Sequence, residues 1–196
     1  MPFTRFILPL SAPRFLGIFV VATLFAGLAL ADHFLEADLA ASWALDPTLL
    51  PEQPWRLLTW CFAQDGWLQA SGNAIGLGVG LCMVARCSGQ GAAWIGLLGS
   101  VLFPALWALH DMTDGAQLQG ASTALYGALG MGTVAWRKLR HELTYTQRTD
   151  WVGGFAVLGL VAFTLAIPLL QGAPARWVHI IAFTWGCAVA ILAPRQ

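Results

Sequence analysis

Residues 66–110 have the sequence GWLQASGNAIGLGVGLCMVARCSGQGAAWIGLLGSVLFPALWALH, in which Arg86 is the only charged residue. A charge in the middle of a bilayer costs about 2.5–3.5 kcal/mol on insertion scales, and a helix needs roughly 20 residues to cross the hydrocarbon. The uncharged windows on the two sides of Arg86, residues 66–85 and 87–110, contain 20 and 24 residues. Each window is therefore predicted to form one transmembrane helix, with Arg86 in the connection.

The composition extends this prediction to the whole sequence of 196 residues. The chain is 58% hydrophobic and only 10% charged, whereas soluble domains are roughly 45–50% apolar and about 25% charged. Uncharged windows long enough to cross a bilayer recur along it. We therefore expect an all-α, polytopic membrane protein, a bundle of six transmembrane helices that forms a single domain over residues 1–196. The expected spans are residues 15–31, 66–85, 92–110, 120–136, 152–170 and 177–194.

The first window also has features of a secretory signal peptide. Arg5 and Arg14 precede its apolar stretch, and Ala29-Leu30-Ala31 could form a cleavage site. Its 17 uncharged residues exceed the usual signal core of roughly 7–15 residues. We therefore expect residues 15–31 to be retained as a helix, with cleavage as the alternative.

The positive charges predict how the chain is oriented in the membrane. If the six spans alternate in direction, eight Lys and Arg residues lie on one side, and only Arg56 and Arg176 lie on the other. By the positive-inside rule, both termini are cytoplasmic. The prediction is a multi-pass protein of the cell inner membrane, embedded in the lipid bilayer. The eight residues on the inner side are Arg5, Arg14, Arg86, Arg137, Lys138, Arg140, Arg148 and Arg195.

Several function classes are disfavoured by the sequence. Ten basic residues balance ten acidic ones, so the chain lacks the basic field that nucleic-acid binding needs. It contains no Walker-type or dinucleotide glycine motif and no His/Cys cluster with metal-ligand spacing. The expected spans carry none of the charges that a transporter usually needs for coupling. We expect neither nucleic acid as a partner nor a metal or organic cofactor.

Other features predict packing and anchoring. Glycines or alanines recur every four residues at 72, 76 and 80 and at 182, 186 and 190, a pattern that allows close helix packing in lipid. Tryptophans 43, 55, 60 and 67 surround the prolines of residues 32–65, and we expect this outer loop to lie in the membrane interface. The cysteines, which we interpret as small core residues, are Cys61, Cys82, Cys87 and Cys187.

Three polar side chains lie at similar depth in the outer half of the expected bundle. Asn73 and Ser122 each lie seven residues inside their windows, and His179 lies two residues inside the last window. At 1.5 Å per residue, their depths differ by less than about 10 Å. A serine and a neutral histidine can act as nucleophile and general base. From depth alone, a helix-capping serine and an interfacial histidine are the more usual interpretations of these two residues.

The surrounding residues resemble rhomboid intramembrane serine proteases. GASTALYG at 120–127 and HIIAFTWG at 179–186 resemble the two catalytic helices of that family, and WRLLT at 55–59 is similar to its tryptophan-arginine motif. The resemblance covers essentially all of the chain after residue 50, and the compact size is similar to the rhombosortase branch. It implies a rhomboid-like six-helix bundle with an active site that opens to the outer face.

The resemblance implies a catalytic dyad. Ser122 would be the nucleophile and His179 the general base. Tyr126, one turn after Ser122, would stack on the histidine ring. Gly120 would leave the preceding loop free to approach the substrate carbonyl, and Gly130 would let the fourth and sixth helices touch.

The resemblance also implies an oxyanion hole and reveals departures from the family pattern. The backbone N–H of Ser122 and the side chains of Gln69 and Asn73 would donate to the oxyanion, and each such donor is typically worth a factor of about 10²–10³. Gln64 and Gln69 stand where rhomboids usually have histidines, and Thr123 replaces the usual glycine after the nucleophile. We interpret Gln64 as a support.

These observations predict an intramembrane serine endopeptidase that cleaves membrane-anchored proteins near the outer interface. The rhombosortase resemblance implies Gly-rich C-terminal sorting tails of exported proteins as substrates, and ordinary single-span proteins are the other expected class. The alternative function is a catalytically inactive rhomboid-like pseudoprotease that acts as a membrane chaperone or adaptor.

Overall fold

The computed structural model describes residues 39–64, 66–112, 117–140 and 173–193, together with Val20, Leu24 and Leu28. Within these residues the regular structure is helical, and a single isolated β-bridge is the only extended pairing. The expected span 152–170, and 15–31 apart from those three residues, lie outside the described part. The helices are α3 (Leu39–Trp43), α4 (Arg56–Thr59), α5 (Trp67–Asp111), α6 (Ser122–Arg140) and α9 (Ala173–Leu192).

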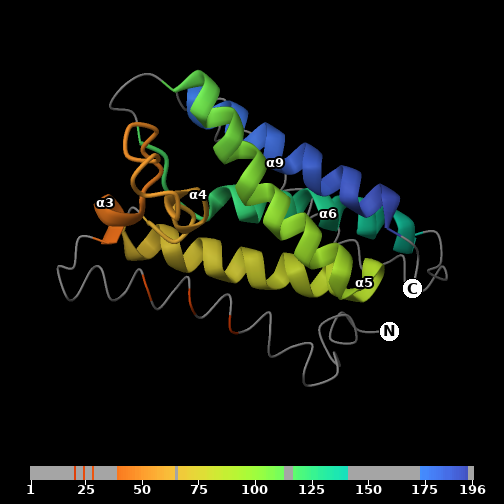
Figure 1. Ribbon diagram of the computed structural model, residues 1–196. Helices are drawn as coiled ribbons and strands as arrows, with labels where there is room; N and C mark the ends of the chain where they lie inside the picture. The colour runs from red at the N-terminus through yellow and green to blue at the C-terminus, as the bar shows by residue number, and fades with distance from the viewer. Residues whose placement is uncertain are drawn as a thin grey trace.

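The long helix α5 is two helices joined at Gly89. Gly89 has φ 83° and ψ 163°, a conformation that side chains of other residues disfavour. It divides α5 into a first arm, residues 67–88, and a second arm, residues 90–111. Figure 1 shows that the second arm returns antiparallel to the first, while α6 and α9 run in the direction of the first arm. The break lies within the inner connection that the sequence predicts after Arg86.

The second arm is the clearest membrane-spanning element of the described residues. Ser88–Asp111 is 24 residues long and apolar enough to cross a bilayer, and it is the one described helix that meets both conditions. Arg176–Leu192 is a shorter apolar helix. Large apolar side chains stay exposed on the outside of the bundle, among them Ile75 and Leu192. Exposed apolar surface of this kind is typical of proteins that contact lipid.

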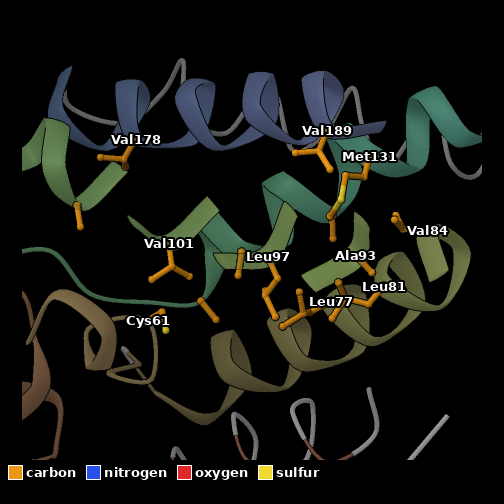
Figure 2. Packing of buried hydrophobic residues seen from close by; sticks show 14 of the residues in the cluster. Cys61, Leu77, Leu81, Val84, Ala93, Leu97, Val101, Met131, Val178 and Val189 are labelled. Carbon is orange, nitrogen blue, oxygen red and sulfur yellow. The ribbon is translucent and has the colours of Figure 1, made fainter. Parts of the chain in front are cut away.

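The core lies where the two arms of α5 meet α6 and α9. Figure 2 shows its side chains pointing toward one another from all of these helices. Leu77 and Leu97 come from the two arms, Met131 from α6 and Val189 from α9, and all four are buried. Helix α6 packs against both α5 and α9, so its first residue is held between two neighbours.

Helices α6 and α9 approach closely enough for their backbones to touch. A Cβ atom at Gly130 of α6 would collide with the carbonyl oxygen of Phe183 of α9. Likewise, a Cβ atom at Gly186 of α9 would collide with the carbonyl oxygen of Gly127. The close approach expected at Gly130 and Gly186 is therefore present, and α6 and α9 lie side by side along this stretch.

The glycines of the first arm pack against α6 in the same way. Cβ atoms at Gly76 and Gly80 would lie 2.6 Å from Leu125 Cδ1 and 2.8 Å from the Cβ of Ala128. A Cβ atom at Gly72 would meet no described residue within 4 Å. Among the described residues, the predicted stripe thus makes its close contacts at Gly76 and Gly80, which face α6.

Candidate active site

Ser122 and His179 meet where α6 and α9 lie side by side. Ser122 is the first residue of α6, and His179 is the seventh residue of α9. The Oγ atom of Ser122 lies 2.8 Å from Nε2 of His179, a normal hydrogen-bond distance. When the ring proton is on Nδ1, Nε2 accepts the serine O–H. Ser122 is half-buried and His179 is buried, so the arrangement can support a nucleophile and a general base.

Tyr126 packs on the ring of His179. The two ring centroids are 4.4 Å apart and the planes are inclined by 32°. Tyr126 lies one turn after Ser122 on the same face of α6, and its side chain is buried. The tyrosine therefore restricts the orientation of the imidazole.

Gly120 lies close to both the Ser122 hydroxyl and the Gln69 side chain. Its φ is 110°, so the chain turns there in a conformation that favours glycine. A Cβ atom at Gly120 would lie 3.7 Å from Nε2 of Gln69, 3.8 Å from Oγ of Ser122 and 4.0 Å from the backbone N of Ser122. The structure thus brings the Gln69 amide and the Ser122 backbone N–H to one place. Both groups can donate hydrogen bonds to an oxygen held there.

Asn73 lies on the same face of the first arm as Gln69. Its Nδ2 donates to Oε1 of Gln64 at 3.0 Å, and Nε2 of Gln64 donates to the carbonyl oxygen of Cys61 at 2.7 Å. The side chains of Asn73 and Gln64 are both buried. The sequence predicted Gln64 only as a support, and the structure gives its side chain two hydrogen-bond partners.

The outer loop is joined to the segment that precedes Ser122. Leu45 and Leu118 exchange two backbone hydrogen bonds, with N···O distances of 2.8 and 3.0 Å. The N–H of Gly120 donates to the carbonyl oxygen of Trp60 at 3.1 Å. These are main-chain contacts between segments far apart in the sequence, and no side-chain pattern could have revealed them.

The side chain of Trp60 is fully buried, with 0% of its surface exposed. The expectation that it anchors the loop in the membrane interface is therefore wrong, because it packs into the protein core at the end of the bundle. Trp55 is 51% exposed and remains available to the interface. The tryptophans of this loop thus differ in burial, and Trp60 serves internal packing.

Arg56 holds the outer loop together from inside. Its guanidinium donates to the carbonyl oxygens of Ala41 and Ala44 at 2.9 and 2.6 Å and to Oε1 of Gln53 at 2.6 Å. The side chain is buried. An arginine at this position satisfies three acceptors at once, which a planar, multiply donating group does best.

Asp46 connects the same loop to the segment before Ser122. The hydroxyl and backbone N–H of Thr48 donate to its Oδ1 at 2.6 and 2.9 Å, and Gln117 donates to Oδ2 at 3.4 Å. The hydrogen bond from the Thr48 hydroxyl is the main cause that lowers the pKa of Asp46 below its ordinary value. The carboxylate is therefore the form that this contact stabilises.

The candidate site offers no donor set for a metal among the residues that the structure describes. No group of three or more His, Cys, Asp and Glu side chains lies close together there. Cys61 is a free thiol next to the site, and burial raises its pKa to about 12. It is thus a protonated core residue, as the sequence predicted for the cysteines.

Comparisons with known proteins bear on this geometry. A family model of the Rhomboid domain matches residues 51–196. No curated protein and no solved structure matches the chain. The matched region contains α4, α5, α6 and α9, and with them every side chain of the candidate site.

Proposed function

Because the chain belongs to the rhomboid family, whose members are membrane-embedded and in general serine proteases, we propose that it is an intramembrane serine endopeptidase. Ser122 is the nucleophile and His179 the general base of a dyad. The observation that supports this assignment is the 2.8 Å contact between Ser122 Oγ and His179 Nε2, with Tyr126 packed on the imidazole. Rhomboid proteases act on membrane-embedded substrates, and we propose the same class here.

The proposed reaction uses the chain's own groups and water. Oγ of Ser122 attacks the carbonyl carbon of the scissile peptide while its proton passes to Nε2 of His179. The imidazolium then protonates the leaving amine, and an acyl-enzyme forms. Water attacks this ester, gives a proton to Nε2, and releases the carboxylate product, after which the proton returns to Ser122. His179 is therefore needed in its neutral form at the start of each half-reaction.

Charge develops on the substrate oxygen in both tetrahedral intermediates. We assign its stabilisation to the backbone N–H of Ser122 and the side-chain amides of Gln69 and Asn73. The closeness of Gln69 Nε2 and Ser122 N to the space beside Gly120 supports the first two donors. Such donors act chiefly on the transition state. Replacement of Gln69 by alanine should therefore lower kcat more than it raises KM.

The proposed orientation puts the dyad near the outer face of a bacterial inner membrane, with both termini in the cytoplasm. The excess of Lys and Arg on the other side of the expected spans supports it. The whole chain would form one domain, with the six spans predicted above. A reporter that works only in the periplasm should be silent when it is fused after Gln196, and an active reporter there contradicts the six-span assignment.

We propose the Gly-rich C-terminal tail of exported proteins as the substrate class. A regular transmembrane helix keeps its carbonyls in internal hydrogen bonds, so the scissile region must unwind. Each glycine weakens a helix by about 1 kcal/mol relative to alanine. The resemblance to the rhombosortase branch supports a tail in which such glycines lie at the outer interface, level with Ser122.

Co-expression with candidate substrates tests this proposal. A tailed exported protein and an ordinary single-span protein are each expressed with the wild-type chain or with Ser122→Ala, and the new C-termini are mapped by mass spectrometry. We expect Ser122-dependent cleavage near the glycines of the tail. An intact tail together with a cleaved single-span protein rejects the tail, and binding of both without cleavage favours the pseudoprotease.

A further inference from the structure

We propose that Gln64 is a positioning residue that fixes the side-chain amide of Asn73 beside the candidate active site. Gln64 accepts a hydrogen bond from Asn73 and donates one to the carbonyl oxygen of Cys61. The consequence for catalysis rests on the proposed function, since it is there that Asn73 donates to the oxyanion. The orientation of the Asn73 amide can be tested whether or not the proposed function holds.

The chemistry of the contacts determines which way both amides point. The carbonyl oxygen of Cys61 can only accept a hydrogen bond, so the NH₂ group of Gln64 must face it. Oε1 of Gln64 then faces away from Cys61 and can only accept, and the NH₂ group of Asn73 must face it in turn. Reversal of either amide would put two acceptors or two donors together. The orientation of Asn73 is thus set by a backbone carbonyl of the outer loop.

Burial makes this orientation costly to lose. Gln64 is 3% exposed and Asn73 is 6% exposed, so water has little access to replace a broken contact. A buried polar group without a partner costs about 1–3 kcal/mol. Figure 2 shows Cys61 next to the packed core at the end of the bundle, and Cys61 belongs to that core.

Asn73 lies on the face of the first arm that meets α6. Gln69 and Gly76 lie on the same helix face, one turn before and about one turn after it. Gln69 approaches Gly120, and Gly76 faces Leu125. Asn73 therefore lies on the stripe that meets the beginning of α6. One N–H of its NH₂ group is used by Gln64, and that bond leaves the second N–H with a fixed direction.

Two successive carbonyl groups of the outer loop thus hold both sides of the site. The carbonyl of Trp60 receives the N–H of Gly120, two residues before Ser122. The carbonyl oxygen of Cys61 accepts a hydrogen bond from the side chain of Gln64, and Oε1 of Gln64 accepts one from Asn73. Because Trp60 and Cys61 are adjacent and buried, the segment before the nucleophile and the Asn73 amide are both attached to two successive peptide units of one buried stretch.

Asn73 is the single asparagine in the sequence, which gives a direct spectroscopic test. Full-length protein labelled with side-chain ¹⁵N-asparagine should show one NH₂ pair, with one proton shifted downfield and slowed in exchange by its bond to Gln64. Gln64→Leu should remove the shift and speed the exchange. Gln90→Leu, at the start of the second arm and separated from Asn73 by more than about 20 Å of the first arm, is the matched control and should leave the pair unchanged.

Gln64→Glu provides the rescue variant. A protonated carboxyl can donate to Cys61 and accept from Asn73, whereas an ionised one has lost the donor. The Asn73 pair in this variant should match the wild type at acid pH and change as the introduced carboxyl ionises. This pH-dependent recovery distinguishes the orientation of Asn73 from general damage to the fold, because the same protein gives both signals.

A kinetic measurement connects the amide to turnover. With a cleavable membrane-anchored substrate, Gln64→Leu should lower kcat by about tenfold or more, up to the 10²–10³ that loss of a donor costs, with KM nearly unchanged. An Asn73 pair that is the same in wild type and Gln64→Leu overturns the proposal, and so does an unchanged kcat. Cleavage that is absent, or independent of Ser122, overturns the proposed function alone, and the Asn73 pair then decides whether Gln64 orients it.

Discussion

The backbone N–H of Gly120 donates a hydrogen bond to the carbonyl oxygen of Trp60 at 3.1 Å. Gly120 lies two residues before Ser122, and the Trp60 side chain is fully buried. The loop before the nucleophile is therefore attached to a part of the outer loop that cannot move without disturbing the core. Changes in the outer loop should alter activity even where they are far from Ser122 in the sequence.

Replacement of Gly120 by alanine should lower both stability and activity. The φ of 110° disfavours a residue with a Cβ atom, and such a conformation costs roughly 1–2 kcal/mol. The added methyl group itself would lie in ordinary contact with Gln69 and Ser122, so the loss is expected from the backbone. Thermal unfolding and the cleavage rate measure the two effects. Wild-type values for both would show that this backbone conformation is not needed.

Gly130 and Gly132 of α6 form a matched pair for the close helix contact. Gly130→Ala would force a methyl group into the carbonyl of Phe183 and should destabilise the protein by about 1–3 kcal/mol. Gly132→Ala meets no described residue within 4 Å and should be neutral or slightly stabilising, since alanine favours a helix. Denaturation in detergent followed by circular dichroism compares them. Equal effects of the two substitutions contradict the backbone contact between α6 and α9.

Arg56→Met should destabilise the outer loop. The carbonyls of Ala41 and Ala44 lose their donor. The contact to Ala44 is buried, and a buried acceptor left without a partner costs about 1–3 kcal/mol. Arg56→Lys should recover only part of the loss, because an ammonium group lacks the planar fork of donors. Arg137→Met, at an exposed position of α6, is the control. Melting temperatures that are the same for all of these variants would exclude a structural role of Arg56.

Acid should weaken the contact between Asp46 and its donors. The pKa of Asp46 is lowered in the folded state, chiefly by the Thr48 hydroxyl, so its contribution to stability is present above the unfolded pKa of about 3.9 and is lost as the pH falls through the folded value. Stability should therefore decline below about pH 4 by more in the wild type than in Asp46→Asn, which lacks this titration. Unfolding measured from pH 3 to pH 6 compares the two. Parallel curves would contradict the lowered pKa.

The sequence contained enough information to predict the long helices of the described bundle and the break between the two arms of α5. Uncharged windows follow from the cost of charge in lipid, and they placed a break after Arg86, where Gly89 interrupts α5. Equal depth brought Ser122 and His179 into consideration together, and the structure has them 2.8 Å apart. Their catalytic roles stay a prediction.

The outer loop could not be predicted in the same way. Its links to the site are main-chain hydrogen bonds of Leu45, Trp60 and Cys61, and main-chain groups are the same in every residue. Trp60 was expected at the interface because tryptophan is common there, but burial in a protein core depends on distant segments. The family resemblance singled out Gln64 as a support, yet its hydrogen-bond partners depend on how the loop folds back.

Reaction with a fluorophosphonate probe tests the central proposal most directly, because it needs no knowledge of the substrate. Membranes or purified full-length protein are treated with the probe, and the modified residue is mapped by mass spectrometry in the wild type, Ser122→Ala and His179→Ala. We expect modification at Ser122 in the wild type, none there in Ser122→Ala, and labelling slowed by at least about 10²-fold in His179→Ala, since an unassisted serine is a weak nucleophile. Folded, inserted wild-type protein that is not labelled at Ser122, or is labelled equally well without His179, would contradict the dyad.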